Sequence, residues 1–150
     1  MALPQIIVTG SSGFVGRHLL ERLAGQYRIF GVARRSQVRS HAPAHPDIVW
    51  FEADVGDRAQ VEATFARIAE LGGAQTVVHL AAHYDFTGDE SPEYWRTNVE
   101  GLRNVLDLSV DLGVRHFVFS SSVAACELPP PGAALTEDSP PAGRHIYART

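Results

Sequence analysis

The sequence predicts an α/β protein built on a doubly wound parallel sheet with strand order 3-2-1-4-5. Three observations lead to this fold class. Five short runs are rich in Val, Ile and Phe, as expected of strands buried between two layers. Segments with helical spacing of apolar residues separate these runs, and this alternation favours a parallel sheet. A glycine-rich segment joins the first strand to the first helix.

The five expected strands share a high content of β-branched and aromatic residues, which favour extended backbone. They are residues 5–9 (QIIVT), 27–33 (YRIFGVA), 47–53 (DIVWFEA), 76–82 (TVVHLAA) and 114–121 (VRHFVFSS).

The three expected helices have apolar side chains on one stripe and end at glycine. They cover residues 14–25, 57–73 and 91–113. The third helix has Pro92 in its first turn, where proline is favoured, and Gly113 after its end. Residues 127–143 are rich in proline and are expected to form a loop.

Length and composition limit the class of protein. The chain has 150 residues, which suits one domain, and a formal net charge of −4, which offers no basic face for nucleic acid. Cys126 is the only cysteine, so no internal disulfide is possible. No apolar run is long enough for a membrane span, and the first residues do not resemble a signal peptide. We expect a cytoplasmic protein that binds neither nucleic acid nor membranes.

The glycine-rich segment VTGSSGFVG has the features of a phosphate-binding turn. Gly10 would make the tight turn, Gly13 would let the backbone approach a pyrophosphate, and Gly16 would let the helix pack closely. The helix that follows would offer free N–H groups to the phosphates. We therefore assign this turn to a dinucleotide in a Rossmann-like fold. The alternative is an ordinary glycine-rich turn. Three neighbours in the turn are assigned to the same ligand: Ser12, Phe14 and Val15.

Six segments occur in a fixed order along the chain: TGSSGFVG, ADVGD, HLAA, RTNVEGLRNVL, FVFSSSVAA and YART. Together they resemble the extended short-chain dehydrogenases/reductases, a group of NAD(P)-dependent epimerases, dehydratases and reductases. The resemblance covers the whole chain and implies one NAD(P)-binding domain over residues 1–150. It implies a small-molecule substrate of the carbonyl, hydroxyl or nucleotide-sugar type. It also implies that the last strands and a C-terminal substrate-binding region are missing from this chain.

The resemblance assigns further residues to the cofactor. Asp54 would hydrogen-bond the adenine amino group, and Val55 would pack against the ring. Leu80, Ala81 and Ala82 follow the fourth strand at the topological switch point, where small side chains let the cofactor lie close. Asp54 has a second interpretation, because it could instead cap the helix that starts near residue 57.

The catalytic residues implied by the resemblance are Ser122, Tyr147 and Asn98. Ser122 would hydrogen-bond the reacting oxygen of the substrate, Tyr147 would act as general acid/base, and Asn98 would help to order the site. Two structural alternatives stay open. Ser122 could be a turn residue at a strand end, and Asn98 could be a buried structural amide.

A phenol has an ordinary pKa of about 10 and is a poor base at neutral pH. Tyr147 therefore needs a nearby cation that favours the phenolate. The family supplies a lysine four residues later, one helical turn away, and this chain contains no lysine. Arg149 would point away from Tyr147 on a helix. We therefore expect a fragment that turns over little substrate alone and exposes the edge of its fifth strand. Such an edge invites pairing with a second copy.

The end of the second strand carries the choice of cofactor. It reads Val32, Ala33, Arg34, Arg35, without the acid that would bind the 2′-hydroxyl of NAD. An arginine could bind the 2′-phosphate of NADP through a charge-assisted hydrogen bond, worth roughly 1.5–3 kcal/mol. We expect a preference for NADP(H). If Arg34 and Arg35 are only solvated loop charges, NAD would bind.

Two histidine pairs, His41/His45 and His79/His83, have a spacing that could suggest metal ligands. The first lies in a Pro-containing loop and the second spans a strand end, so no metal site is expected. His83, with Tyr84 and Asp85 beside it, could line a substrate pocket. Cys126 stands where sugar epimerases often have an aromatic residue, which leaves room for a ketone or hydroxysteroid-type reductase.

Two other functions stay open. One is a non-catalytic NAD(P)-binding or sensing module, and the other is a structural subdomain whose edge pairs with another polypeptide. An intact Ser122 and Tyr147 favour the enzyme.

Overall fold

The sheet of this protein has five parallel strands in the order β3-β2-β1-β4-β5. A computed structural model describes residues 2–87 and 89–150. The predicted strand order and the Rossmann-like α/β fold are confirmed. The strands are β1 (Gln5–Thr9), β2 (Arg28–Ala33), β3 (Ile48–Glu52), β4 (Thr76–His79) and β5 (His116–Phe119).

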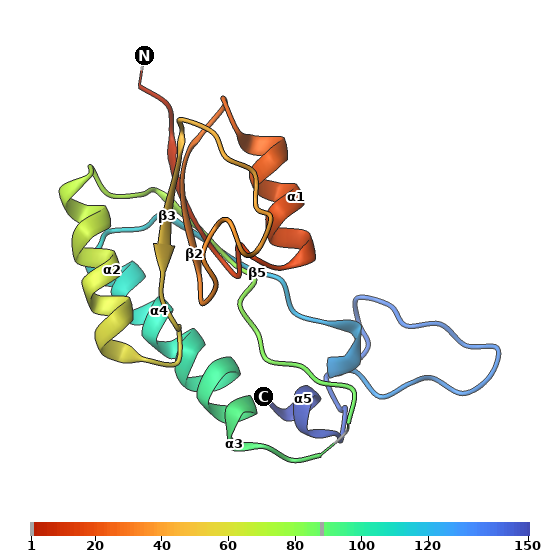
Figure 1. Cartoon of the computed structure of the whole chain (residues 1–150). Coiled ribbons are helices and arrows are strands. Elements are labelled where there is room, and N and C mark those ends of the chain that lie inside the picture. Colours follow the sequence, from red (N-terminus) through yellow and green to blue (C-terminus); the bar gives the residue numbers. More distant parts are fainter. Residues whose placement is uncertain (1, 88) are drawn as a thin grey trace.

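Helices pack on both faces of the sheet, with α1 on one face and α2 and α4 on the other (Figure 1). The side chains of β1 alternate between these faces. Ile6 and Val8 share a buried cluster with Leu20 of α1, whereas Ile7 is buried with Val61 of α2. No helix within residues 2–87 or 89–150 is long and apolar enough to cross a membrane. The α-helices are α1 (Phe14–Leu23), α2 (Arg58–Glu70), α3 (Pro92–Tyr94), α4 (Gly101–Asp111) and α5 (Ile146–Arg149).

The helix predicted over residues 91–113 is one helical segment with a wider turn inside it. The side chain of Ser91 caps α3 by accepting a hydrogen bond of 3.3 Å from the backbone N–H of Glu93. Between α3 and α4 the chain forms the π-helical turn η1 (Trp95–Glu100). Such a turn accommodates one extra residue, and the adjacent Thr97 and Asn98 are both buried in it.

The last strand and the segment after it are the most open part of the described chain. β5 is an edge strand, and Val118 and Phe119 are 49% and 54% exposed. A short 3₁₀ helix, η2 (Val123–Ala125), follows it. Residues 127–143 contain no helix or strand and project from the body of the molecule as the predicted loop (Figure 1).

Candidate functional site

The turn between β1 and α1 lies tightly against its neighbours. Gly10 has a φ of +69°, and a Cβ there would lie 2.6 Å from the carbonyl carbon of Leu80. A Cβ at Gly16 would lie 2.8 Å from the Cα of Ser11. Both positions therefore require glycine. Gly13 is the N-cap of α1, so the first N–H groups of this helix have no side-chain cap. They are free to bind an anion.

A first cleft, with a volume of about 380 Å³, lies at the carboxyl ends of the strands beside this turn. It contains all the expected cofactor residues except Phe14, Val15 and Gly16. Its lining consists of Gly10, Ser12, Gly13, Val32, Ala33, Arg34, Arg35, Ala53, Asp54, Val55, Leu80, Ala81, Ala82 and Thr97.

The three expected residues outside this lining belong to the first turns of α1. Phe14 and Val15 are 73% and 59% exposed. The ring of Phe14 lies 4.6 Å from that of His18, and Gly16 is buried under the turn. These residues shape the turn from outside the cleft. Four further residues line the cleft without having been assigned to the cofactor from the sequence: Val32 and Ala33 at the end of β2, Ala53 after β3, and Thr97 in η1.

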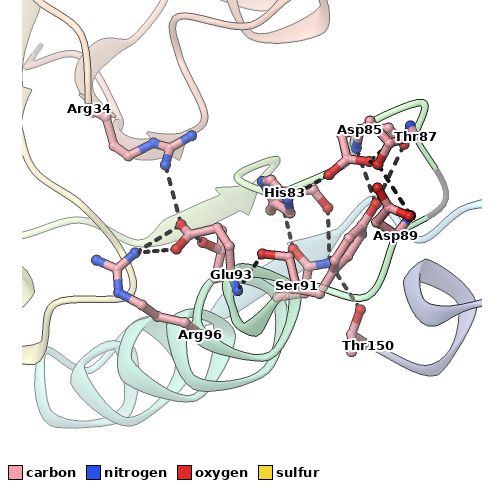
Figure 2. Close-up of polar contacts among 12 residues, drawn as sticks. Arg34, His83, Asp85, Thr87, Asp89, Ser91, Glu93, Arg96 and Thr150 are labelled. Atoms are coloured by element: carbon pink, nitrogen blue, oxygen red, sulfur yellow. Dashed lines mark hydrogen bonds and ion pairs between the residues drawn. The ribbon is translucent and has the colours of Figure 1, made fainter.

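The two arginines after β2 have different partners. Nη2 of Arg35 donates a 3.0 Å hydrogen bond to the carbonyl oxygen of Ser12, within the glycine-rich turn. Nη1 of Arg34 lies 3.3 Å from Oε1 of Glu93 in α3 (Figure 2). Both arginines line the first cleft, and Arg34 pairs with a carboxylate that lies outside the cleft lining.

Asp54 is bonded through both carboxylate oxygens. One accepts a 2.9 Å hydrogen bond from the N–H of Gly56, and the other lies 2.7 Å from Nη2 of Arg96. Partial burial alone would raise the pKa of Asp54, but the hydrogen bonds from Arg96 and Gly56 outweigh it and hold this pKa below its ordinary value. The N-cap of α2 is Asp57, whose side chain accepts from the N–H of Gln60. Asp54 therefore shapes the turn before α2 and does not cap it.

A second cleft of about 170 Å³ adjoins the first. Ala81 and Ala82 line both clefts, so the two hollows share one wall. The second cleft brings together the three expected catalytic residues. Its lining consists of His79, Ala81, Ala82, Asn98, Phe119, Ser120, Ser121, Ser122, Ala125, Tyr147, Ala148 and Thr150.

Asn98 ties three segments together at this cleft. Its Oδ1 accepts a 2.7 Å hydrogen bond from the N–H of His83, and its Nδ2 donates to the carbonyl oxygen of His83 at 3.1 Å and to Oγ1 of Thr150 at 3.2 Å. This side chain is buried and has the contacts of a structural amide at the wall of the cleft.

Ser122 and Tyr147 reach the cleft from short helices. Oγ of Ser122 accepts a 3.2 Å hydrogen bond from the N–H of Ala124 and caps η2. Its own proton is left for another acceptor. Tyr147 lies in α5, with its ring 4.8 Å from that of Tyr84. Arg149 pairs with Glu90 on the loop after β4.

Residues of the loop after β4 form a third hollow beside Tyr147. Tyr84 and Asp85 line it together with Tyr147. His83 does not line this hollow; its Nε2 lies 3.4 Å from Oδ2 of Asp85 (Figure 2). The hydrogen bonds from Thr87 lower the pKa of Asp85. Over residues 2–87 and 89–150, no three His, Cys, Asp or Glu side chains form a group that could hold a metal ion.

The fold and these clefts define a Rossmann-like α/β protein with two adjoining clefts at the carboxyl ends of its strands. Comparison with known proteins agrees, since residues 6–150 match the NAD dependent epimerase/dehydratase family. The chain belongs to this family.

Its relatives include reductases and epimerases. The chain is 33% identical over 119 residues to a putative dihydroflavonol 4-reductase of Synechocystis, covering 79% of this chain and 32% of the relative. It is 28% identical over 128 residues to a UDP-glucose 4-epimerase of Streptococcus mutans, covering 83% and 37%. The chain thus spans about a third of the length of these relatives.

A solved structure has a similar fold. The Bordetella bronchiseptica enzyme WbmG, determined in complex with NAD and UDP, superposes with a TM-score of 0.82 at 26% identity. The match covers 99% of this chain and 46% of WbmG.

Proposed function

We propose that this chain is the NAD(P)-binding part of an epimerase, dehydratase or reductase of the extended short-chain type. The first cleft would hold the dinucleotide, with its pyrophosphate on the turn from Gly10 to Gly16. The second cleft would hold the reacting group of a small molecule. The shared wall of Ala81 and Ala82 carries this proposal, because the reacting end of a ligand in the first cleft can meet a substrate in the second.

The bound nicotinamide would supply or accept a hydride. Ser122 would donate a hydrogen bond to the substrate oxygen, since its own proton is free while its oxygen caps η2. Tyr147 would give a proton to that oxygen in reduction and take one in oxidation. Asn98 would hold the walls of the second cleft in place by fixing the backbone of His83. These roles require a carbonyl or hydroxyl group on the substrate, including the sugar ring of a nucleotide-sugar.

We also propose NADP(H) as the better ligand of the two nicotinamide dinucleotides, on the basis of Arg34 and Arg35. Both line the first cleft, at the end of β2 where a 2′-phosphate would lie.

A second candidate function is cofactor binding without catalysis. It is favoured by one observation: the chain contains no lysine, so none of its side chains places an ammonium beside Tyr147. We propose that the 150 residues alone bind the cofactor and turn over little substrate.

Titration with NADH, followed by nicotinamide fluorescence, tests the first cleft. Gly13 has an ordinary φ of −77°, and a Cβ there would lie 3.2 Å from the carbonyl oxygen of Gly10. Gly13→Val should fold after a shift of a few tenths of an ångström in this turn, fill the cleft and weaken NADH binding at least tenfold. Glu137→Gln, in the projecting loop, is the control and should bind as the parent does. Equal NADH binding by Gly13→Val and the parent would show that the dinucleotide does not bind in this cleft.

Ser122→Ala and Tyr147→Phe test the second cleft. Both variants should bind NADH normally. In the protein isolated from its native source, each should lower turnover by roughly 10²-fold or more, the usual contribution of acid–base catalysis. Turnover unaffected by both substitutions would remove Ser122 and Tyr147 from the catalytic site, and the absence of any turnover in the parent protein would favour the non-catalytic alternative.

A further inference from the structure

Glu93 places a carboxylate beside the arginine that was assigned to the 2′-phosphate. It lies 59 residues from Arg34 in the sequence, at the start of the long helical segment, and its Oε1 is 3.3 Å from Nη1 of Arg34 (Figure 2). The end of β2 itself carries no acid. The helix α3 thus brings beside Arg34 an acid that the end of β2 lacks.

Other contacts hold this carboxylate in place. Oγ1 of Thr97 donates to Oε1 of Glu93 at 2.7 Å, and Nη1 of Arg96 lies 2.8 and 3.1 Å from its two oxygens. Partial burial would raise the pKa of Glu93, but the hydrogen bonds from Thr97 and Arg96 lower it below the ordinary value. Glu93 is therefore ionised at neutral pH.

Four of the five charged side chains near the end of β2 are paired with an opposite charge. Arg34 faces Glu93, and Arg96 faces both Glu93 and Asp54. Arg35 binds a neutral carbonyl group instead, that of Ser12. Of the two arginines that line the cleft, Arg34 already has a counterion and Arg35 binds only a dipole.

We propose that Glu93 is a specificity-determining residue that opposes recognition of a 2′-phosphate by competing for Arg34. This inference rests on the proposed binding of nicotinamide dinucleotides. A 2′-phosphate would have to displace Glu93 from Arg34 or lie close to its negative charge, and both weaken binding. The neutral 2′-hydroxyl of NAD leaves the ion pair intact. Arg35 carries most of the preference for NADP(H) in the native chain, and that preference is small.

The test is the ratio of NADPH to NADH affinity, since these two ligands differ only by the 2′-phosphate. In Glu93→Gln the amide oxygen can still accept from Thr97, so the variant should fold. NADPH should bind about tenfold more tightly than to the parent chain, the size of one charge-assisted contact. NADH affinity should change less than twofold. Glu100→Gln is the matched control, because Glu100 lies in the same helical segment but pairs with Arg103, which does not line the first cleft, whereas Glu93 pairs with Arg34, which does.

Arg34→Ala in the parent chain supplies a second measurement, which does not depend on the folding of the Glu93 variant. In the parent chain it should weaken NADPH binding less than threefold, because Arg34 is engaged by Glu93. In the Glu93→Gln background the same change should cancel the tenfold gain.

The outcomes separate the inference from the proposed function. An unchanged or smaller NADPH-to-NADH ratio in Glu93→Gln, with NADH still bound, overturns the role of Glu93 alone. A loss of thirtyfold or more in Arg34→Ala also overturns it, because Arg34 would then be free for the phosphate. If the parent chain binds neither NADH nor NADPH, the proposed cofactor site fails, and the inference fails with it.

Discussion

Oγ1 of Thr9 lies 2.9 Å from Nδ1 of His79, which joins the carboxyl ends of β1 and β4 inside the core. The same oxygen accepts hydrogen bonds from the N–H groups of Leu80 at 3.2 Å and Ala81 at 3.3 Å. Its own proton is therefore directed to Nδ1, and His79 carries its proton on Nε2. This neutral histidine fixes the backbone that forms the shared wall of the two clefts.

Burial of His79 makes the protein sensitive to acid. Burial lowers the pKa of His79 from its ordinary 6.5 to about 4. Between these two values the unfolded chain binds a proton that the folded chain does not. The stabilisation is complete above pH 6.5 and is lost as the pH falls to 4, by about 3 kcal/mol in total. Urea unfolding at pH 7.5, 5 and 4 measures this loss.

His79→Gln removes the titrating group and should flatten the pH dependence by that amount, although the variant is less stable at pH 7.5. The exposed His116 on β5 provides the control, and His116→Gln should keep the parent's pH dependence. An equally steep loss in His79→Gln would assign the acid sensitivity to other groups.

Gly10→Ala should destabilise the fold and abolish NADH binding. The left-handed backbone costs roughly 1–3 kcal/mol with a side chain, and the new Cβ would also collide with the backbone of Leu80. Gly113 separates these two effects, because its φ is +76° but no atom lies within 4 Å of the position of a Cβ. Thermal unfolding should show a smaller loss for Gly113→Ala, with NADH binding retained. Equal losses in both variants would mean that the contact with Leu80 is unimportant.

Asn98→Ala should lower the free energy of unfolding by about 1–3 kcal/mol, because the N–H and carbonyl groups of His83 lose their buried partner. Asn98→Asp keeps an acceptor for the N–H of His83 and should lose less. Urea unfolding of both variants measures which of them loses more free energy of unfolding. A loss in Asn98→Asp as large as in Asn98→Ala would show that the accepted hydrogen bond contributes little.

The exposed edge at β5 should make the isolated chain self-associate. Val118 is 49% exposed on this edge strand, and a lysine there should oppose strand pairing. Sedimentation velocity should show association of the parent at high concentration and a shift to monomer in Val118→Lys. Val38 is 84% exposed outside the sheet, and Val38→Lys should associate like the parent. A monomeric parent chain at high concentration contradicts this prediction.

The strands and the glycine-rich turn could be predicted because both are marked by local sequence, and the strand order followed from the fold class that they indicate. The length of the apolar runs indicates strands, and the spacing of the glycines indicates a phosphate-binding turn. The partner of Arg34 could not be predicted in this way. Whether Glu93 reaches it depends on how the helix after β4 crosses the sheet, which is a property of the whole fold.

The turn η1 illustrates the same limit. The residues on either side of it have α-helical spacing, and no residue type in WRTNVE indicates a wider turn. Sequence reasoning identified Asn98 but left open whether it was catalytic or structural. Its bonds to His83 depend on a loop that arrives from β4, so only the folded chain reveals them.

The wider turn η1 also affects how the side chains of α3 and those of α4 are oriented about the helix axis relative to each other. Each residue of an α-helix turns the chain by about 100°, and the wider turn of η1 takes up its extra residue, so that α3 and α4 keep nearly the phase of a continuous helix. Glu93 of α3 is bonded to Arg34, and Asn104 of α4 is bonded to the carbonyl oxygen of Val55. Inserting one more residue between them would turn α4 by about 100° relative to α3 and uncouple the two contacts. The spacing of the helical segment thus keeps its two ends bonded to the loops that follow β2 and β3.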